Sequence, residues 1–407
     1  MRIVLLGGGV AGLFFANLFD GELLIIEKND TAGRKLLATG NGRCNFTNLN
    51  LKLNNYHSMG GEFYKYALEK YDNQDLISFL NGLGILTTHL PSGRCYPQTL
   101  SSKTIRDILL LNSKAKFMYE TEVIDIDFEN RLLITNKSKI PFDRLIIATG
   151  GMSLAGSGSD GKIFEIIKDK QKITRLSYAI TNYKTENPLS KKSKGVRVTA
   201  KASLFVDGKF VKKSTDDIIF QSYGLTGTAI LDLSNHISYA LFENRDIWVS
   251  IDLLEDYPEE KLFEIIKNLS KNNPERTIEE ILMGFLNQKL TQDILKRVKL
   301  KRKTWVKKLS DDDIRKLIKT IKDLRFKITA INDEENAQVT IGGVDTSLVD
   351  DQTFESKVIP GLYIIGEALD VDGDCGGYNI QWAYSSAKAC AKSLSKGNRE
   401  EINVKDK

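Results

Sequence analysis

Three glycines near the start of the chain have the spacing of a dinucleotide-binding turn. Gly7, Gly9 and Gly12 form the pattern G-x-G-x-x-G between an apolar run and a helical pattern. The first glycine permits a tight turn, the second lets a pyrophosphate approach the backbone, and the third lets the helix pack closely. Free N–H groups at the helix start then face the phosphates. Glu27 ends the next apolar run, 20 residues after Gly7, and is placed to bind a ribose hydroxyl.

Three later segments favour FAD over NAD as the dinucleotide. Residues 32–35 (AGRK) follow the acid directly, and residues 148–151 (ATGG) end another apolar run. Residues 361–366 lead through DGDCGGYN, residues 372–379, into a helical pattern. In FAD-binding folds such a last helix points its N-terminus at the flavin and stabilises negative charge on the reduced ring. The sequence therefore predicts an FAD site assembled from both ends of the chain.

Residues 40–45 (GNGRCN) are the best candidate for the chemistry. Their glycines let the backbone lie against a flat ring. Arg43 could stabilise an anionic reduced flavin or a substrate oxyanion, and the Cys44 thiol could donate a proton. Because free cysteines are commonly just buried, we favour a packing role for Cys44 and a functional role for Arg43. The candidate catalytic residues are Arg43, Cys44 and Asn45.

The remaining reactive side chains form no convincing pattern. Cys375 lies beside the predicted flavin, but a disulfide reductase would place two cysteines in one short segment. The three histidines, His57, His89 and His236, fall in no strong motif, so surface or capping roles and no metal are expected. Residues 156–161 repeat the G-x-G-x-x-G spacing without a second βαβ unit. We therefore expect no separate NAD(P)H domain, and an NADH or NADPH donor would visit the flavin transiently.

Positive charge is concentrated in the middle of the chain. Residues 188–335 hold 28 Lys and Arg against 23 Asp and Glu, which accounts for the whole net charge of +5. Within them, residues 296–308 (KRVKLKRKTWVKK) hold eight basic residues, no acid, and Trp305. Such a run could bind a phosphate backbone while the indole stacks on a base. The alternative is a solvated helix face offset by residues 311–313 (DDD). Both rRNA and a small molecule remain candidate substrates.

The bulk composition is that of an ordinary soluble globular protein. The chain has 407 residues, 41% apolar and 27% charged, enough for two or three domains. No stretch approaches the ~20 apolar residues needed to span a bilayer, and the apolar N-terminus is too short for a signal peptide. The four cysteines lie far apart without a C-x-x-C pair, which fits a reducing compartment. We expect a cytoplasmic protein with no membrane association, and its oligomeric state stays open.

The elements that must position these residues change type along the chain. Residues 1–27 have the pattern strand, turn, helix, strand, and helical spacing follows over 62–83 and 103–112. Short β-like runs separated by turn residues begin after Pro188. The prediction is an α/β fold whose Rossmann-like FAD-binding domain carries an insertion. The expected ranges are 1–187 and 326–407 for the FAD-binding domain, 188–256 for an inserted β-barrel-like domain, and 257–325 for a small helical domain.

Taken together, the motifs resemble the HI0933-like (YhiN/BaiN) family of FAD-dependent flavoproteins. The resemblance runs from the first strand to the last helix, and it is most specific in GNGRCNFTN and in the long C-terminal block. In that family an FAD domain carries an inserted barrel-like domain and a helical domain. The matching stretches are GGGVAGLFFA, EKNDTAGRKLLATGNGRCNFTN, PSGRCYPQTLSSKTIRDIL, LIIATGG, VTIGGVD and TFESKVIPGLYIIGEALDVDGDCGGYNIQWAYSSA.

The resemblance implies which parts of FAD each segment would meet. The glycine turn would hold the pyrophosphate, and the segment after the second strand the adenosine ribose and the length of the cofactor. The start of the last helix would present N–H groups to the isoalloxazine. The implied cofactor-binding residues are Gly7, Gly9, Ala11, Gly12, Glu27, Lys28, Arg34, Lys35, Gly42, Arg43, Val123 (adenine), Thr149, Gly150, Gly366, Glu367, Gly377, Asn379 and Ile380.

The resemblance also implies an activity. We expect an FAD-dependent oxidoreductase that transfers hydride between flavin and a substrate held between the FAD domain and the insertion. Reduction of a C=C bond, such as uridine in rRNA to dihydrouridine, is one case, and ketone or enone reduction or amine oxidation of a small metabolite is the alternative. A non-catalytic flavin-binding or RNA-binding protein is the alternative of another class. The chain departs from the family at residues 221–224 (QSYG), where Thr-His-x-Gly is frequent, and at Cys375, where threonine is common.

Overall fold

The computed structural model describes residues 1–405, with side chains through Ser395, and consists of two compact units. The first unit contains Met1–Ala179 and Glu335–Lys407, and the second contains Ile180–Glu334. The second unit is therefore one continuous segment inserted into the first. From the sequence, we predict these junctions at 187/188 and 325/326. The last two residues of the predicted range 326–407 lie outside the described residues.

A five-stranded sheet forms the centre of the first unit. Every pairing in it is parallel. The strands are short apolar runs, such as IVLL in β1 and LLII in β2, as expected where helices cover both faces. The predicted Rossmann-like α/β fold is confirmed. In order across the sheet the strands are β20 (Leu362–Ile364), β11 (Arg144–Ile147), β1 (Ile3–Leu6), β2 (Leu23–Ile26) and β7 (Lys116–Met118).

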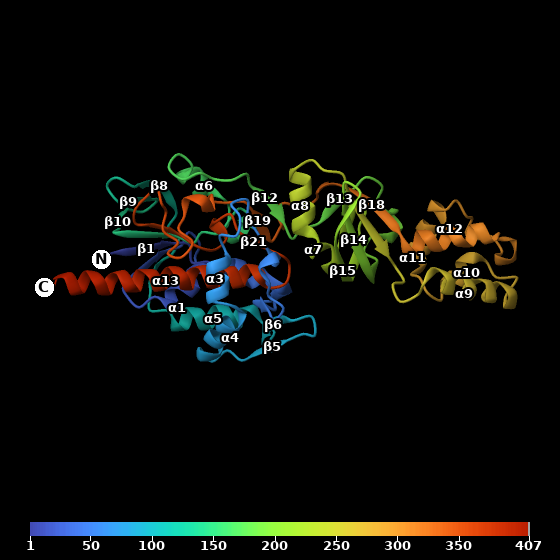
Figure 1. Cartoon of the computed structure of the whole chain (residues 1–407), viewed down its shortest axis with the longest axis horizontal. Helices are drawn as coiled ribbons and strands as arrows, with labels where there is room; N and C mark the ends of the chain where they lie inside the picture. Colours follow the sequence, from blue (N-terminus) through green and yellow to red (C-terminus); the bar gives the residue numbers. More distant parts are fainter. Residues whose placement is uncertain (406–407) are drawn as a thin grey trace. The chain divides into compact units, whose positions relative to one another are not determined.

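The first and the last long helices of this unit pack against each other. Figure 1 shows α1 (Val10–Leu18) alongside α13 (Tyr378–Lys405). The rings of Phe14 and Tyr384 meet edge to face, with centroids 5.3 Å apart. Because α1 follows the glycine turn, this contact joins the two ends of the chain at the predicted cofactor site.

Smaller elements surround this centre. Helix α5 (Ser102–Asn112) confirms the helix predicted over 103–112. The helical spacing over 62–83 corresponds to two helices: α3 (Lys65–Lys70) ends before Asp72 and α4 (Asn73–Gly82) begins after it, because Asp72 accepts the Asp75 N–H as an N-cap. The other elements are α2 (Arg34–Ala38), α6 (Lys162–Ile167), the sheets β10 (Lys139–Pro141)–β9 (Leu132–Thr135)–β8 (Val123–Asp127) and β3 (Thr47–Asn48)–β6 (Arg94–Pro97)–β5 (Thr87–His89), and the pairs β4 (Tyr56–His57)–β21 (Asp372–Gly373) and β12 (Ser177–Ala179)–β19 (Val339–Ile341).

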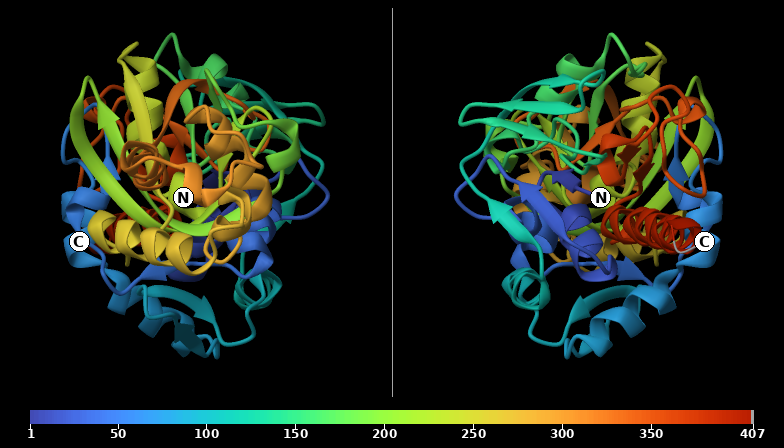
Figure 2. Two further views of the ribbon diagram at one scale, coloured as in Figure 1. Left: turned by 90° about the vertical axis from the view of Figure 1, so that its right-hand side faces the viewer. Right: turned by 90° about the vertical axis from the view of Figure 1, so that its left-hand side faces the viewer.

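The second unit is built on a closed antiparallel barrel of six strands. Its long strands β14 and β15 bend strongly, as Figure 2 shows. Two barrel strands, β13 and β18, lie outside the range 188–256 that the sequence assigned to the β-rich region. In order the strands are β13 (Tyr183–Thr185), β16 (Gly224–Thr226), β15 (Lys209–Phe220), β14 (Arg197–Val206), β17 (Ile247–Asp252) and β18 (Leu324–Ile331).

Helices interrupt the barrel strands at two points. After β16 come α7 (Thr228–Leu231) and α8 (Ser234–Phe242), which the strand-like reading of this region missed. Between β17 and β18 come α9 (Glu259–Asn272), α10 (Ile278–Leu282), α11 (Gln288–Arg297) and α12 (Asp311–Lys322). The helical region is thus an insertion between two consecutive strands of the barrel, β17 and β18. In the described part of the chain, every helix is too short or too polar to cross a bilayer.

Candidate functional site

The carboxyl ends of four neighbouring strands bring the predicted dinucleotide residues to one edge of the sheet. The glycine turn follows β1, Glu27 follows β2, residues 148–150 follow β11, and residues 366–367 lie just beyond β20. The Ala148 N–H donates to the Leu6 carbonyl at 2.8 Å, which ties two of these ends together. In open α/β sheets, ligands bind in the crevice at this edge.

The glycines of the turn are required for different reasons. Gly7 has φ +95°, and a Cβ on Gly12 would lie 2.3 Å from the Gly7 carbonyl oxygen. Protein packing therefore excludes side chains from these two positions. A Cβ on Gly9 would have its nearest described neighbour, the Ala148 oxygen, at 3.7 Å, an ordinary contact. The fold itself leaves room at Gly9, as expected if the missing side chain makes way for a ligand.

Glu27 points back over the glycine turn. Its Oε2 accepts the Gly8 N–H at 2.8 Å, and its Oε1 accepts both the backbone N–H and the side-chain amide of Asn29 at 2.8 Å. The Thr121 N–H donates to the Glu27 carbonyl at 3.0 Å, which brings the chain toward Val123 at the start of β8. Oε2 accepts only one of these bonds and has a second lone pair, so the carboxylate can also accept a ribose hydroxyl.

The predicted cofactor-binding cations after β2 are engaged with acids of the chain. Lys28 forms an ion pair with Asp160 at 2.7 Å, and Arg34 with Asp30 at 2.6 Å. Asn29 donates to the Ser157 carbonyl at 3.1 Å. The second glycine-rich loop, residues 156–161, therefore lies against the end of β2.

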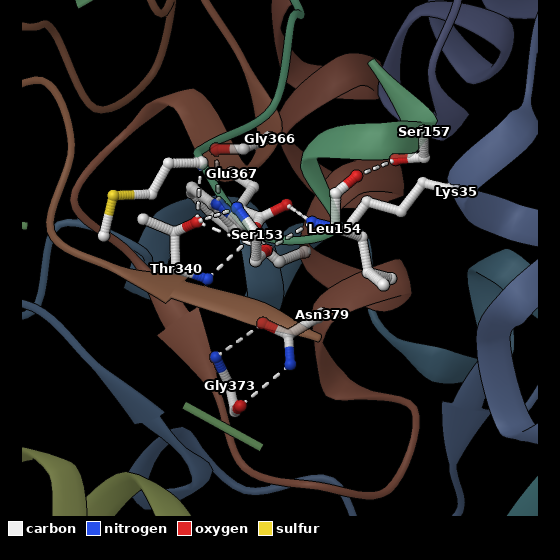
Figure 3. A network of polar contacts seen from close by, with 11 residues as sticks. Lys35, Ser153, Leu154, Ser157, Thr340, Gly366, Glu367, Gly373 and Asn379 are labelled. Atoms are coloured by element: carbon white, nitrogen blue, oxygen red, sulfur yellow. Dashed lines mark hydrogen bonds and ion pairs between the residues drawn. The ribbon is translucent and has the colours of Figure 1, made fainter. Parts of the chain in front are cut away.

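Lys35 and Glu367 hold each other in a polar network shown in Figure 3. Lys35 Nζ donates to Glu367 Oε2 at 2.6 Å and to Ser153 Oγ at 2.7 Å. Glu367 Oε1 accepts the Ser153 hydroxyl at 3.0 Å and the Thr340 N–H at 2.8 Å. The side chains of Lys35 and Glu367 are 22% and 20% exposed. This network fixes residues from four segments at the sheet edge.

Several buried polar atoms at this edge and in the 40–45 loop have no partner among the described residues. They are Thr149 Oγ1, Ser159 Oγ and Asn45 Oδ1. Thr149 lies directly beside Gly7, and Ser159 beside Gly150. Buried polar atoms are normally hydrogen-bonded, so a ligand that supplies donors and acceptors here satisfies them. Together with the space at Gly9, these atoms fit a bound dinucleotide.

The loop of residues 40–45 has an unusual backbone. Gly40, Asn41, Gly42 and Cys44 all have positive φ, between +55° and +81°. The Arg43 side chain is exposed and forms no hydrogen bond or ion pair with the described residues. Cys44 is fully buried, and this burial raises the pKa of its thiol to about 12. The arrangement leaves Arg43 available to an anion and favours the packing interpretation of Cys44.

The start of α13 lies against the segment that follows this loop. Gly377 has φ +100°, and a Cβ there would lie 2.6 Å from the Thr47 carbonyl oxygen. The Asn379 side chain pairs with both backbone groups of Gly373 at 2.8 Å (Figure 3), and Ile380 is buried. The three residues predicted to meet the isoalloxazine, Gly377, Asn379 and Ile380, thus lie at the start of α13. The first N–H groups of a helix have no acceptor within the helix.

The structure reveals one polar pair that the sequence did not suggest. His57 Nε2 donates to Asp374 Oδ1 at 3.1 Å, and the two side chains are 18% and 5% exposed. The partners are 317 positions apart, and neither lies in a motif for proton transfer. The only sequence signal is that Asp374 directly precedes the CGGYN segment.

In the second unit, the basic segment 296–308 is not a single helix face, because α11 ends at Arg297. Arg297 donates to two backbone carbonyls, Arg302 pairs with Glu279, and Lys307 pairs with Glu275. Trp305 is 43% exposed. The basic side chains that form no ion pair with the described residues are those of Lys296, Lys299, Lys301, Lys303 and Lys308.

The chain is similar to known proteins over nearly its whole length. The family model described as HI0933-like protein Rossmann domain matches residues 1–393. The 3-dehydro-bile acid delta(4,6)-reductase of Clostridium scindens is 28% identical over 97% of this chain and 99% of its own. The ribosomal RNA dihydrouridine synthase of Escherichia coli is 30% identical over 96% and 97%. A solved 3-ketosteroid delta1-dehydrogenase from Sterolibacterium denitrificans aligns over 97% of this chain and 99% of its own, with TM-score 0.49 and 11% identity.

Proposed function

The chain belongs to the HI0933-like family and is an FAD-dependent oxidoreductase, and from this premise we propose that it reduces a C=C bond in a uridine of RNA. A delta(4,6)-reductase and a dihydrouridine synthase both saturate a carbon–carbon double bond, although their substrates differ. The observation that favours RNA here is an exposed tryptophan, Trp305, in a segment of the second unit whose Lys299, Lys301 and Lys303 form no ion pair with the described residues.

We further propose how this chain holds its cofactor, whose bound flavin supplies hydride transfer. N–H groups of the glycine turn bind the pyrophosphate, and Glu27 accepts a ribose hydroxyl. Thr149 Oγ1, which has no described partner, hydrogen-bonds to the ADP half. Arg43 stabilises negative charge at the ring end. NADH or NADPH is the proposed electron donor, and it would visit the flavin transiently.

The basic segment supports RNA through both charge and stacking. Lys299, Lys301 and Lys303 are exposed in the loop between α11 and Trp305. Each phosphate neutralised by a lysine strengthens binding through counterion release, and an aromatic ring adds about 1–3 kcal/mol per stacked base.

Charge reversal in the basic segment tests whether the substrate is RNA. We expect the triple variant Lys299→Glu, Lys301→Glu, Lys303→Glu to lose modification of rRNA in cells and to bind rRNA with a shallower salt dependence. Arg302 stays unchanged, because replacing it would break its ion pair with Glu279. The matched control reverses the exposed Lys191, Lys192 and Lys194 of the same unit. Unchanged rRNA modification in the first variant would contradict the RNA substrate.

A small enone is the second candidate, favoured by the similarity to the bile acid reductase over nearly the full chain. Anaerobic reduction of the purified protein with NADPH, followed by mixing with a 3-oxo-Δ4,6 bile acid or with rRNA from cells lacking the protein, separates the two. Reoxidation by the bile acid but not by rRNA would identify the enone as the substrate. A flavin that no donor reduces would point to a non-catalytic flavin-binding or RNA-binding protein.

A further inference from the structure

We propose that His57, positioned by Asp374, donates the proton that accompanies hydride addition to the substrate double bond. This inference rests on the proposed C=C reduction and names the general acid that this reduction requires. Saturating a double bond requires a proton as well as a hydride, and none of the candidate residues in the 40–45 loop is suited to supply it.

The geometry of the pair is that of an oriented imidazole. Asp374 Oδ1 accepts from His57 Nε2 at 3.1 Å, and Oδ2 accepts from the Asn55 side-chain amide at 3.2 Å. The Asp374 N–H donates to the Asn55 carbonyl at 2.9 Å. With both oxygens engaged, the buried carboxylate fixes the ring and keeps the proton on Nε2, as a carboxylate does in a catalytic triad.

Three contacts place this pair at the start of α13. The β4–β21 pairing sets His57 opposite Asp372 and Tyr56 opposite Gly373. The Asn379 side chain binds both backbone groups of Gly373 at 2.8 Å, and the Tyr56 hydroxyl donates to the Tyr378 carbonyl at 3.1 Å. The pair is therefore fixed to the segment that is expected to face the isoalloxazine.

Cys44, Tyr56 and Arg43, which also belong to this region, are poor proton donors. Burial raises the pKa of Cys44 to about 12. Burial also raises the pKa of Tyr56 well above its usual range, and that hydroxyl is already donated to Tyr378. Arg43 does not release its proton in proteins. Imidazole is the side chain that exchanges protons near neutral pH.

The step balances as follows. One carbon of the double bond takes the hydride that the oxidoreductase activity supplies from NAD(P)H. The electron pair of the π bond forms a new bond from the other carbon to the imidazolium proton, and the N–H bond of that imidazolium breaks. Neutral His57 then regains a proton from water, so two electrons and two hydrogens enter the substrate.

The test separates proton donation from flavin chemistry. His57→Asn, His57→Gln and Asp374→Asn are compared with His89→Asn, which changes an exposed histidine of the same unit. The readouts are the dissociation constant of FAD, anaerobic reduction by NADPH, and reoxidation of the reduced protein by ferricyanide, by rRNA from cells lacking the protein, and by a 3-oxo-Δ4,6 bile acid. Ferricyanide takes an electron without a proton, so it reports the cofactor alone.

We expect both His57 variants to bind FAD and to react with NADPH and ferricyanide like the wild type. Their reoxidation by the C=C substrate should fall roughly 10²–10⁴-fold, the usual contribution of general acid catalysis. Asp374→Asn should slow the same step by a smaller factor at unchanged KM. Wild-type rates with the C=C substrate, or loss of FAD from both His57 variants, would overturn the proposal. If the wild type reduces neither substrate, the proposed function fails first, and this inference fails with it.

Discussion

The two ends of the predicted cofactor site are built by different means. The phosphate end, residues 7–12 with Glu27 and Thr149, consists mostly of backbone at the carboxyl edge of a sheet. The ring end, residues 40–45 with β4 and the start of α13, depends on side chains that meet across long stretches of sequence, such as His57 and Asp374. A backbone site leaves a short local motif, whereas a side-chain site leaves none.

The phosphate end also shows that one motif can contain glycines of two kinds. Gly12 is required by the fold, since its Cβ would lie 2.3 Å from a backbone oxygen, whereas Gly9 is not, since its Cβ would lie 3.7 Å from one. If this distinction is right, substitutions at the two positions should have separable effects on folding and on FAD binding.

The largest effect is expected for Gly12→Ala. The new methyl cannot fit against the Gly7 carbonyl unless α1 moves away from the sheet, and such overpacking costs about 1–3 kcal/mol or more. Urea unfolding should show a loss of about 3 kcal/mol, and the purified protein should be colourless. The control is Gly82→Ala in α4, where nothing lies within 4 Å of the added Cβ. Unfolding of Gly12→Ala at the wild-type urea midpoint would contradict the steric argument.

A loss confined to the cofactor is expected for Gly9→Asp. Aspartate is a favoured N-cap residue, and the fold has room for its Cβ, so the apoprotein should keep its stability. Its charge would face the pyrophosphate, and the affinity for FAD should fall at least about 100-fold, or about 2.8 kcal/mol. Isothermal titration of apoprotein with FAD measures this. Gly9→Asn, of the same shape without the charge, should lose less. Equal affinities for the two variants would argue that no phosphate lies there.

Much of the fold could be predicted because it follows from local pattern. The strand–turn–helix–strand start, α5 and the buried strand β11 all carry their apolar period or their turn residues within about ten positions. The family resemblance added the cofactor and the expected insertion. What local pattern could not supply was the closing of the barrel, since β18 pairs with β13 and β17 across the helical insertion.

The candidate site likewise has a part that the local sequence pattern predicts and a part that it does not. Gly7, Gly9, Gly12 and Glu27 lie where the motif placed them. The ion pair of Lys35 and Glu367 joins residues 332 positions apart, and no periodicity connects them. The break between α3 and α4 was missed because a capping aspartate interrupts an apolar period that otherwise continues.

A buried carboxyl near the ring end should make stability depend on pH. Asp370 is fully buried, and burial raises its pKa to about 6. Between about pH 4 and 6 the folded state therefore binds a proton that the unfolded state has lost, so this group destabilises the fold increasingly as the pH rises from about 4 to 6, and by a constant amount above that. At 1.36 kcal/mol per pH unit, Asp370→Asn should gain about 2–3 kcal/mol over wild type at pH 8.

The same variant supplies its own control at low pH. Below about pH 3 the carboxyl is protonated in both states, so the difference from wild type should nearly vanish in urea unfolding at pH 3. Asp351→Asn, at an exposed position, should show no such trend. A constant difference across this pH range would indicate that the gain comes from packing rather than from charge.

The smallest effect is expected where the two ends are joined. Lys35 lies in α2, just before the 40–45 loop, and Glu367 lies at the sheet edge, so their ion pair links the ring end to the phosphate end. Since both side chains are about one-fifth exposed, solvent screening limits the pair to about 1 kcal/mol. A double-mutant cycle with Lys35→Met and Glu367→Gln, read by urea unfolding of the apoprotein, should give that coupling energy. If Lys35 acts by holding Glu367, Lys35→Met should lower the affinity for FAD far less than Gly9→Asp does. A larger loss of affinity than of stability would instead place the Lys35 ammonium on the cofactor itself.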